Sequence, residues 1–166
     1  MRVPYRKPGK YSQLPMDPIM SEKKFCELKS KLDRLQRVSR PRAITEMSRL
    51  AETGDFSENA GYQAVKGRLR GINQAIMAIE IQIKQAVIVE QRAVDGKVRI
   101  GNLVTVETNN TQKTYQILGS SESSPSKGII SHTSPLGSAL LGARSGDDVI
   151  VKLTNKIVKY KIIKVE

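Results

Sequence analysis

Residues 52–63 read ETGDFSENAGYQ, a turn-forming segment between two long stretches that have the hydrophobic period of a helix. After this segment, apolar residues recur at alternating spacings of four and three, at Val65, Leu69, Ile72, Ile76, Ile79, Ile83 and Ala86. That heptad pattern is typical of a coiled-coil helix. Two amphipathic helices joined by a few residues pack antiparallel, so we expect the segment at the far end of a helical hairpin.

The stretch before the turn carries a similar seam, at Phe25, Leu28, Leu32 and Leu35 and again at Ile44, Met47 and Ala51. Ser21 is predicted to cap this first helix, and Ser57 the second. A break or kink is expected around Arg40-Pro41, because proline lacks the backbone donor that the helix needs.

From about residue 97 the hydrophobic period changes to two, which is typical of strands. Residues 102–108 and 113–118 predict a hairpin, residues 136–141 a short helix, and residues 148–153 and 157–165 two further strands. In the last strand Val158, Tyr160 and Ile162 should face one way, with Lys159 and Lys161 on the other side. The fold class is therefore α+β, with an antiparallel coiled-coil hairpin at 21–90 and a compact β domain at 91–166.

Residues 1–20 hold four prolines and several basic residues, and we expect a disordered basic leader there. The 28 Lys and Arg residues against 16 Asp and Glu give a net charge of +12, which favours an anionic partner. The single cysteine, Cys26, excludes an intramolecular disulfide and a cysteine-based zinc finger. No apolar run has the length of a transmembrane span or the form of a signal peptide, so a cytoplasmic location is expected.

Two groups of side chains are candidates for function. Asp55 and Glu58 could share a divalent ion, although two carboxylates are too few to hold Mg²⁺ tightly. The alternative is that they stabilise the start of a helix, where acidic residues are favoured. Lys66, Arg68 and Arg70 follow within two turns and could bind phosphates, or could form an ordinary solvated helix face.

Two separate segments, ETGDFSENAGYQAVKGRLR at 52–70 and SPLGSALLGARSGDDVIV at 134–151, resemble the bacterial Gre transcript-cleavage factors. The resemblance extends over about residues 20–166. It implies an N-terminal antiparallel coiled coil and a C-terminal domain of FKBP-like fold. It also implies a transcription elongation factor that is no enzyme by itself. Such a factor enters the secondary channel of bacterial RNA polymerase and stimulates the polymerase's own cleavage of backtracked RNA.

The resemblance assigns roles to individual residues. Asp55 and Glu58 match the acidic tip, where they would help to hold a second Mg²⁺, shared with the polymerase, and the attacking water. Lys66, and less closely Arg68 and Arg70, match basic residues that attract the nascent RNA. Thr133, Ser134 and Pro135 match the polymerase-binding segment, although an Asn or Asp is usual where Thr133 stands. No cofactor of its own and no membrane partner are implied, and we expect a monomer.

Other functions stay open on the sequence. One is an anti-cleavage homologue that inhibits transcription by occupying the channel, although such relatives tend to carry several extra acids at the tip and the segment GDFSENA at 54–60 does not. Another is a basic coiled-coil protein that binds nucleic acid. A prolyl isomerase is disfavoured, because that site needs an aromatic-lined pocket and residues 91–166 contain only Tyr115 and Tyr160 as aromatics.

Overall fold

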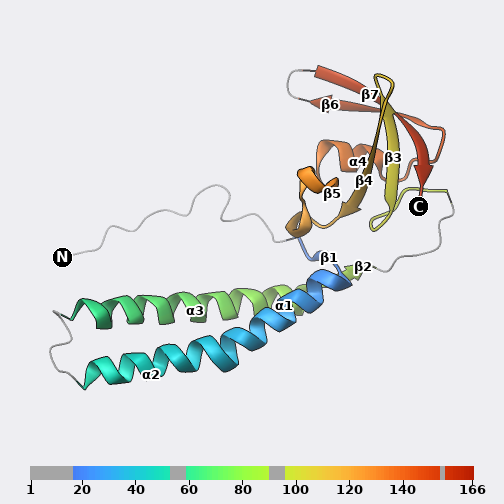
Figure 1. Ribbon diagram of the computed structural model, residues 1–166. Coiled ribbons are helices and arrows are strands. Elements are labelled where there is room, and N and C mark those ends of the chain that lie inside the picture. The colour runs from blue at the N-terminus through green and yellow to red at the C-terminus, as the bar shows by residue number, and fades with distance from the viewer. Residues whose placement is uncertain (1–16, 53–58, 90–95, 154–155) are drawn as a thin grey trace, which may run out of the picture.

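The computed structural model describes residues 17–52, 59–89, 96–153 and 156–166 of the 166-residue chain. A long helical hairpin lies beside a smaller domain built on a β-sheet, and the two meet near the base of the hairpin (Figure 1). The predicted fold class, a helical hairpin followed by a sheet domain with a short helix, is confirmed. None of the described helices is long and apolar enough to cross a lipid bilayer.

The first arm of the hairpin runs through α1 (Glu22–Arg34), a π-helical turn η1 (Leu35–Ser39) and α2 (Arg40–Ala51) without leaving the helical conformation. The second arm is α3 (Ala60–Gln85), which packs against all three. The interruption predicted near Arg40-Pro41 is therefore present, as a π-helical turn that ends at Ser39, two residues before the proline. Such a turn holds one extra residue without ending the helix.

The heptad seam forms the contact between the two arms. Val65, Ile76 and Ile79 of α3 are buried. The seam position predicted at Ile44 is wrong, since Ile44 is 41% exposed and the neighbouring Ala43 is only 2% exposed. The extra residue in η1 rotates the helix that follows it, so the contact moves by one position.

The residue that caps the first helix is the predicted one, whereas the residue that caps α3 differs from the prediction. Ser21 caps α1, because its hydroxyl accepts a hydrogen bond from the Lys24 N–H (3.1 Å). The cap predicted at Ser57 is wrong: Asn59 caps α3 by accepting from the Tyr62 N–H (3.0 Å). Asparagine is as good a cap as serine and stands directly before the first helical residue.

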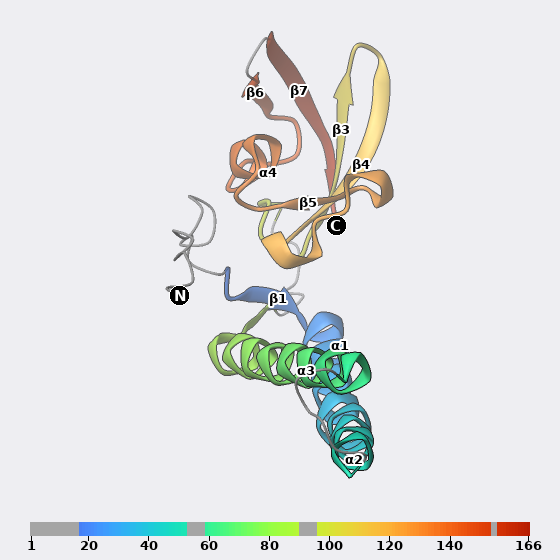
Figure 2. The ribbon, with the colours of Figure 1, turned by 90° about the vertical axis from the view of Figure 1, so that its left-hand side faces the viewer.

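The strand β1 (Ile19–Ser21) pairs in parallel with β2 (Val87–Val89) and joins the start of the hairpin to its end. Met20 is 2% exposed and packs with Leu28 and Ile79. The predicted disordered leader is therefore too long, because residues 17–20 are part of the fold, while residues 1–16 lie outside the described residues. Figure 2 shows β1 between the helices and the sheet domain.

The C-terminal domain is a five-stranded sheet in the order β5-β4-β3-β7-β6. Its strands are β3 (Leu103–Thr108), β4 (Thr111–Leu118), β5 (Ile129–Ser131), β6 (Asp148–Leu153) and β7 (Lys156–Val165). Every neighbouring pair is antiparallel except β4 and β5, which are parallel, so the sheet is mixed rather than wholly antiparallel. The connection between these two strands carries the short 3₁₀ turns η2 (Ser120–Glu122) and η3 (Pro125–Lys127).

The hairpin predicted in this domain is confirmed, with a tight turn at Asn109 and Asn110, whose φ angles are 48° and 57°. Asparagine tolerates this left-handed conformation better than most residues. The helix α4 (Pro135–Leu140) packs onto the inner face of the sheet. The buried core residues are Val98, Val104, Val106, Ile117, Ile130, Leu140 and Ile162. The side chains of β7 alternate as predicted, with Ile162 buried and Lys159 and Lys161 exposed.

Candidate functional site

The end of the helical hairpin that lies away from the sheet domain is formed by the C-terminus of α2 and the N-terminus of α3 (Figure 1). Asp55 and Glu58 lie in the sequence between these helix ends, but residues 53–58 are outside the described residues. Their assignment as metal ligands stays a prediction. Elsewhere, in the part of the chain that the structure describes, no group of three or more His, Cys, Asp or Glu residues is arranged to hold a metal ion.

Asn59 ties the two helices together at this end. Its side-chain oxygen caps α3, and its side-chain N–H group donates a long hydrogen bond to the Leu50 carbonyl in α2 (3.5 Å). A Cβ added at Gly61 would lie 3.1 Å from the same Asn59 oxygen and 3.7 Å from Leu50. The cap was expected at Ser57 instead, although an asparagine directly before a helical pattern is a recognised cap signal.

The three basic residues proposed to bind RNA do not share one surface. Lys66 and Arg70 are exposed and four residues apart on α3, which places them on the same face of the helix. Arg68 points elsewhere and forms an ion pair with Glu46 of α2 (2.8 Å). That pair is largely exposed to solvent, so it contributes little to stability. The face best suited to bind phosphate is therefore the one with Lys66 and Arg70.

The segment predicted to bind the polymerase surrounds the start of α4. The Ser134 hydroxyl donates to the Ser131 carbonyl (2.6 Å) and accepts from the Gly137 N–H (3.0 Å), which makes Ser134 the cap of this helix. Thr133 and Pro135, on either side, are exposed. Ser134 thus holds the segment in one conformation, and the Thr133 hydroxyl lies 2.7 Å from the hydroxyl of Ser131.

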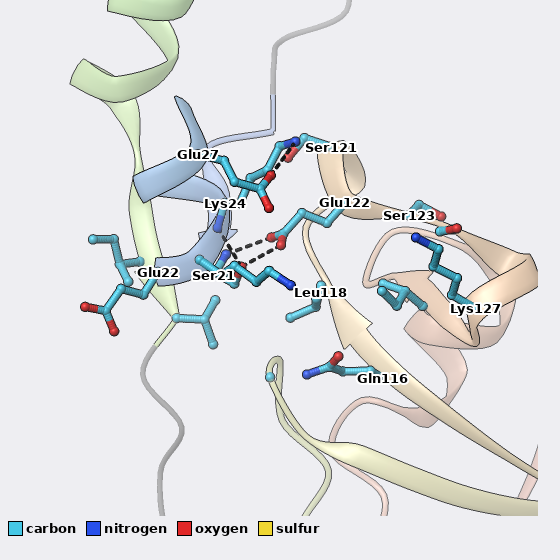
Figure 3. Close-up of a pocket in the computed structure, with 16 residues that line it drawn as sticks. Ser21, Glu22, Lys24, Glu27, Gln116, Leu118, Ser121, Glu122, Ser123 and Lys127 are labelled. Carbon is cyan, nitrogen blue, oxygen red and sulfur yellow. Dashed lines mark hydrogen bonds and ion pairs between the residues drawn. The ribbon is translucent and has the colours of Figure 1, made fainter. Parts of the chain in front are cut away.

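The base of the hairpin meets the sheet domain along a cleft of about 800 Å³, lined by Lys24, Glu27, Glu122 and Lys127 among others (Figure 3). Beside it, Asp17 lies close to Ser120 and His132. Burial acts to raise the pKa of the Asp17 carboxyl. Hydrogen bonds from Ser120 and from the Ile19 N–H, together with nearby His132, outweigh burial and bring this pKa below its ordinary value. Asp17 is therefore a charged acceptor at neutral pH.

Two family models match this chain, one for each domain. Residues 18–88 match the family "Transcription elongation factor, N-terminal", and residues 93–166 match "Transcription elongation factor, GreA/GreB, C-term". The chain is 36% identical over 149 residues to transcription elongation factor GreA of Macrococcus caseolyticus, with 88% of this chain and 94% of that protein covered. It is 38% identical over 149 residues to GreA of Maridesulfovibrio salexigens, with coverages of 88% and 92%.

Among solved structures, the crystal structure of GreA factor homolog 1 (Gfh1) of Thermus thermophilus aligns at 23% identity with a TM-score of 0.40. This alignment covers 89% of this chain and 97% of that one. The two domain matches, in order along the chain, and relatives above 30% identity over most of it show that the chain belongs to the GreA/GreB family of transcription elongation factors.

Proposed function

We propose that this protein enters the secondary channel of RNA polymerase in the cytoplasm and stimulates the polymerase's own cleavage of backtracked RNA. The observation that carries the proposal is the position of the two helix ends that flank residues 53–58. They lie at the end of the hairpin remote from the sheet domain (Figure 1). The 26 residues of α3 span about 39 Å. The tip of the hairpin can therefore reach a point on the partner that lies far from the surface bound by the sheet domain.

The chemistry of the two tip residues supports a shared metal site. Carboxylate oxygens are the ligands that Mg²⁺ prefers, but two of them leave most of its coordination shell to water. Asp55 and Glu58 would therefore bind the ion only where the polymerase supplies further ligands. The bound Mg²⁺ would lower the pKa of a water molecule and stabilise charge on the cleaved phosphate. Asp55 and Glu58 would contribute ligand oxygens and orient that water.

The sheet domain would provide most of the binding energy. Exposed Thr133 and Pro135 lie at the start of α4, on a segment that the Ser134 cap holds in one conformation. A preformed loop loses little conformational entropy when it binds. We therefore assign polymerase docking to Thr133, Ser134 and Pro135, with Ser134 acting through its effect on the local structure.

The direct test is a cleavage assay on two substrates. We expect the purified protein to stimulate cleavage of nascent RNA in backtracked elongation complexes and to leave free RNA intact, because its own metal site is incomplete. Cleavage of free RNA would contradict the mechanism. Slower RNA synthesis without any cleavage would instead identify an anti-cleavage factor, and binding to free nucleic acid alone would identify a general nucleic-acid-binding protein.

The basic face of α3 gives a second prediction. Replacing Lys66 and Arg70 together by alanine should reduce cleavage most for long backtracked RNA, which extends further along the hairpin. The attraction is between Lys or Arg side chains and phosphates, so the advantage of the wild type should shrink as salt rises. The measurement is the cleavage rate against salt for short and long backtracks.

Arg68→Ala is the matched control for this experiment, because Arg68 also lies on α3 but forms an ion pair with Glu46. We expect it to change the rate less than the double variant. All three substitutions raise helix propensity slightly or leave it unchanged. Unfolding of the helix therefore does not account for a lower cleavage rate. Equal losses on short and long backtracks would show that Lys66 and Arg70 form only a solvated face.

A further inference from the structure

Two carboxylates, one from each side, connect the hairpin to the sheet domain. Asp17, which precedes β1, accepts a hydrogen bond from the backbone N–H of Ser120, the first residue of η2 (2.7 Å). Glu122, the last residue of η2, accepts from the backbone N–H of Ser21 (2.7 Å) and from its hydroxyl (2.5 Å). Figure 3 shows the Glu122 carboxylate directed at Ser21. Each domain thus supplies an acceptor for the backbone of the other.

The contact with Ser21 completes the first turn of α1. In a capping box, the residue three positions after the cap is Glu or Gln, and its side chain accepts the N–H of the cap residue. Lys24 occupies that position here and has no acceptor to offer. Glu122 supplies the missing acceptor from the other domain. The cap of α1 is therefore complete only when the two domains have the observed orientation.

In the part of the chain that the structure describes, the other contacts between the two domains are chiefly those of β1 with η2 and with β4. A cleft of about 800 Å³ separates much of the first turn of α1 from the sheet domain, so the two surfaces are not packed like a core. The backbones approach closely at one point, where a Cβ added to Gly119 would lie only 1.8 Å from the Ile19 carbonyl oxygen. The Asp17 carboxylate also lies 3.4 Å from the His132 ring. Among the described residues, the joint thus combines these directed polar contacts with close approaches at Gly119 and at Gly101, where an added Cβ would lie 2.9 Å from Val89 of β2.

The length of the hairpin makes this joint important. With an arm of about 39 Å, a rotation of about 10° at the base moves the far end by about 7 Å. Mg²⁺ needs its oxygen ligands at about 2.0–2.1 Å, so a tip error of 1 Å is already large. An angle held within about 1.5° keeps the tip within that error. Loosely tethered domains do not meet this requirement.

We propose that Asp17 and Glu122 form a reciprocal clamp that fixes the direction of the helical hairpin relative to the sheet domain. They are positioning residues, which act on the reaction through the location of the tip. The effect of the clamp on the reaction rests on the proposed cleavage function, whereas the clamp itself is a structural property of the free protein.

The clamp can be tested in the full chain by measuring the distance between two spin labels. One label is placed at Gly67→Cys, where an added Cβ has no neighbour within 4 Å, and the other at Lys113→Cys, an exposed position of β4. The background is Cys26→Ser, because Cys26 is exposed and would also be labelled. We expect one narrow distance distribution for this background and a broadened or shifted one after Glu122→Ala.

Glu27→Ala is the control. Glu27 lines the same cleft and carries the same charge as Glu122, but it forms an ion pair with Lys24 of its own helix (3.5 Å). We expect its distance distribution to match the background. Asp17→Ala should act like Glu122→Ala. If Glu122→Ala and Asp17→Ala both keep the narrow distribution, the clamp does not set the angle and the proposal is overturned.

A rescue variant separates positioning from helix stability. Adding Lys24→Glu to Glu122→Ala places the capping-box acceptor within α1, three positions after Ser21, and should restore any helicity lost with Glu122. It does not restore the link between the domains. We therefore expect normal circular dichroism with a distance distribution that is still broad. Recovery of the narrow distribution would show that Glu122 acts only as a helix cap.

The effect on function is measured as the rate of RNA cleavage at saturating protein, without labels. A tip misplaced by an ångström or more should lower the rate by about 10- to 100-fold in Glu122→Ala, and Glu27→Ala should keep the wild-type rate. A broad distribution with a full cleavage rate would overturn the positioning role. Failure of the wild type to stimulate cleavage would instead overturn the proposed function, while the distance measurements would still decide on the clamp.

Discussion

Asp55→Asn and Glu58→Gln are each expected to lower the rate of stimulated RNA cleavage by about 100-fold or more, while polymerase binding stays nearly unchanged. A metal ion stabilises the transition state by several kcal/mol, and 1.36 kcal/mol corresponds to a factor of ten. Each substitution keeps the size and shape of the side chain but removes the negative charge that would hold the ion. The loss should appear in the maximal rate rather than in the concentration for half-maximal effect, because we propose that docking lies in the other domain.

Glu52→Gln is the matched control for these variants. Glu52 is exposed at the end of α2, and its substitution removes the same charge within a few residues of the tip pair. We expect it to keep at least half of the wild-type rate. If Asp55→Asn or Glu58→Gln kept full cleavage at saturating protein, that carboxylate would have only the role of stabilising a helix end, which is the alternative that the sequence left open.

Gly137→Ala is expected to cause a large loss of stability in the sheet domain. A Cβ at this position would lie 2.1 Å from the Ser131 carbonyl oxygen and 3.0 Å from the Ser134 hydroxyl. The first neighbour is backbone and cannot move away without shifting β5 or α4. Leu140 of α4 is fully buried, so a shift of this helix also disturbs the core. We expect a loss of about 3 kcal/mol in the free energy of unfolding.

Thermal unfolding measures this effect directly. For a domain of this size, about 3 kcal/mol corresponds to a decrease of about 10–20 °C in the midpoint. Gly67→Ala is the control, because the same methyl group at Gly67 meets no atom within 4 Å, and a gain of up to about 1 kcal/mol is expected from helix propensity. Polymerase affinity should fall with Gly137→Ala, since α4 supports Thr133 and Pro135. An unchanged midpoint would contradict the close contact.

Most local features could be predicted from the sequence, because each follows from neighbouring residues. The spacing of Val65, Ile76 and Ile79 depends only on the helical period, and these side chains are buried. The turn at Asn109 and Asn110 follows from their tolerance of positive φ angles. The predicted seam was wrong at Ile44, because the preceding π-helical turn at Leu35–Ser39 shifts the helical period by one residue.

The candidate site was predictable in part. The tip carboxylates, the basic residues and the docking segment were named from a resemblance in sequence, and the structure adds how some of them are arranged. Lys66 and Arg70 share a face, whereas Arg68 pairs with Glu46, 22 residues away in the sequence. Ser134 is a helix cap rather than an exposed contact. These distinctions depend on which residues lie next to each side chain in space. The sequence pattern does not give those positions.

The sequence by itself determined the two domains, the antiparallel hairpin and the acidic segment between its helices, because hydrophobic period and turn residues act over a few positions. Only the tertiary structure decided how the domains meet. Ser21 and Glu122 are 101 residues apart, and Asp17 and Ser120 are 103 apart. Each hydrogen bond needs two such groups within about 3 Å and correctly oriented, a condition set by the packing of the whole chain.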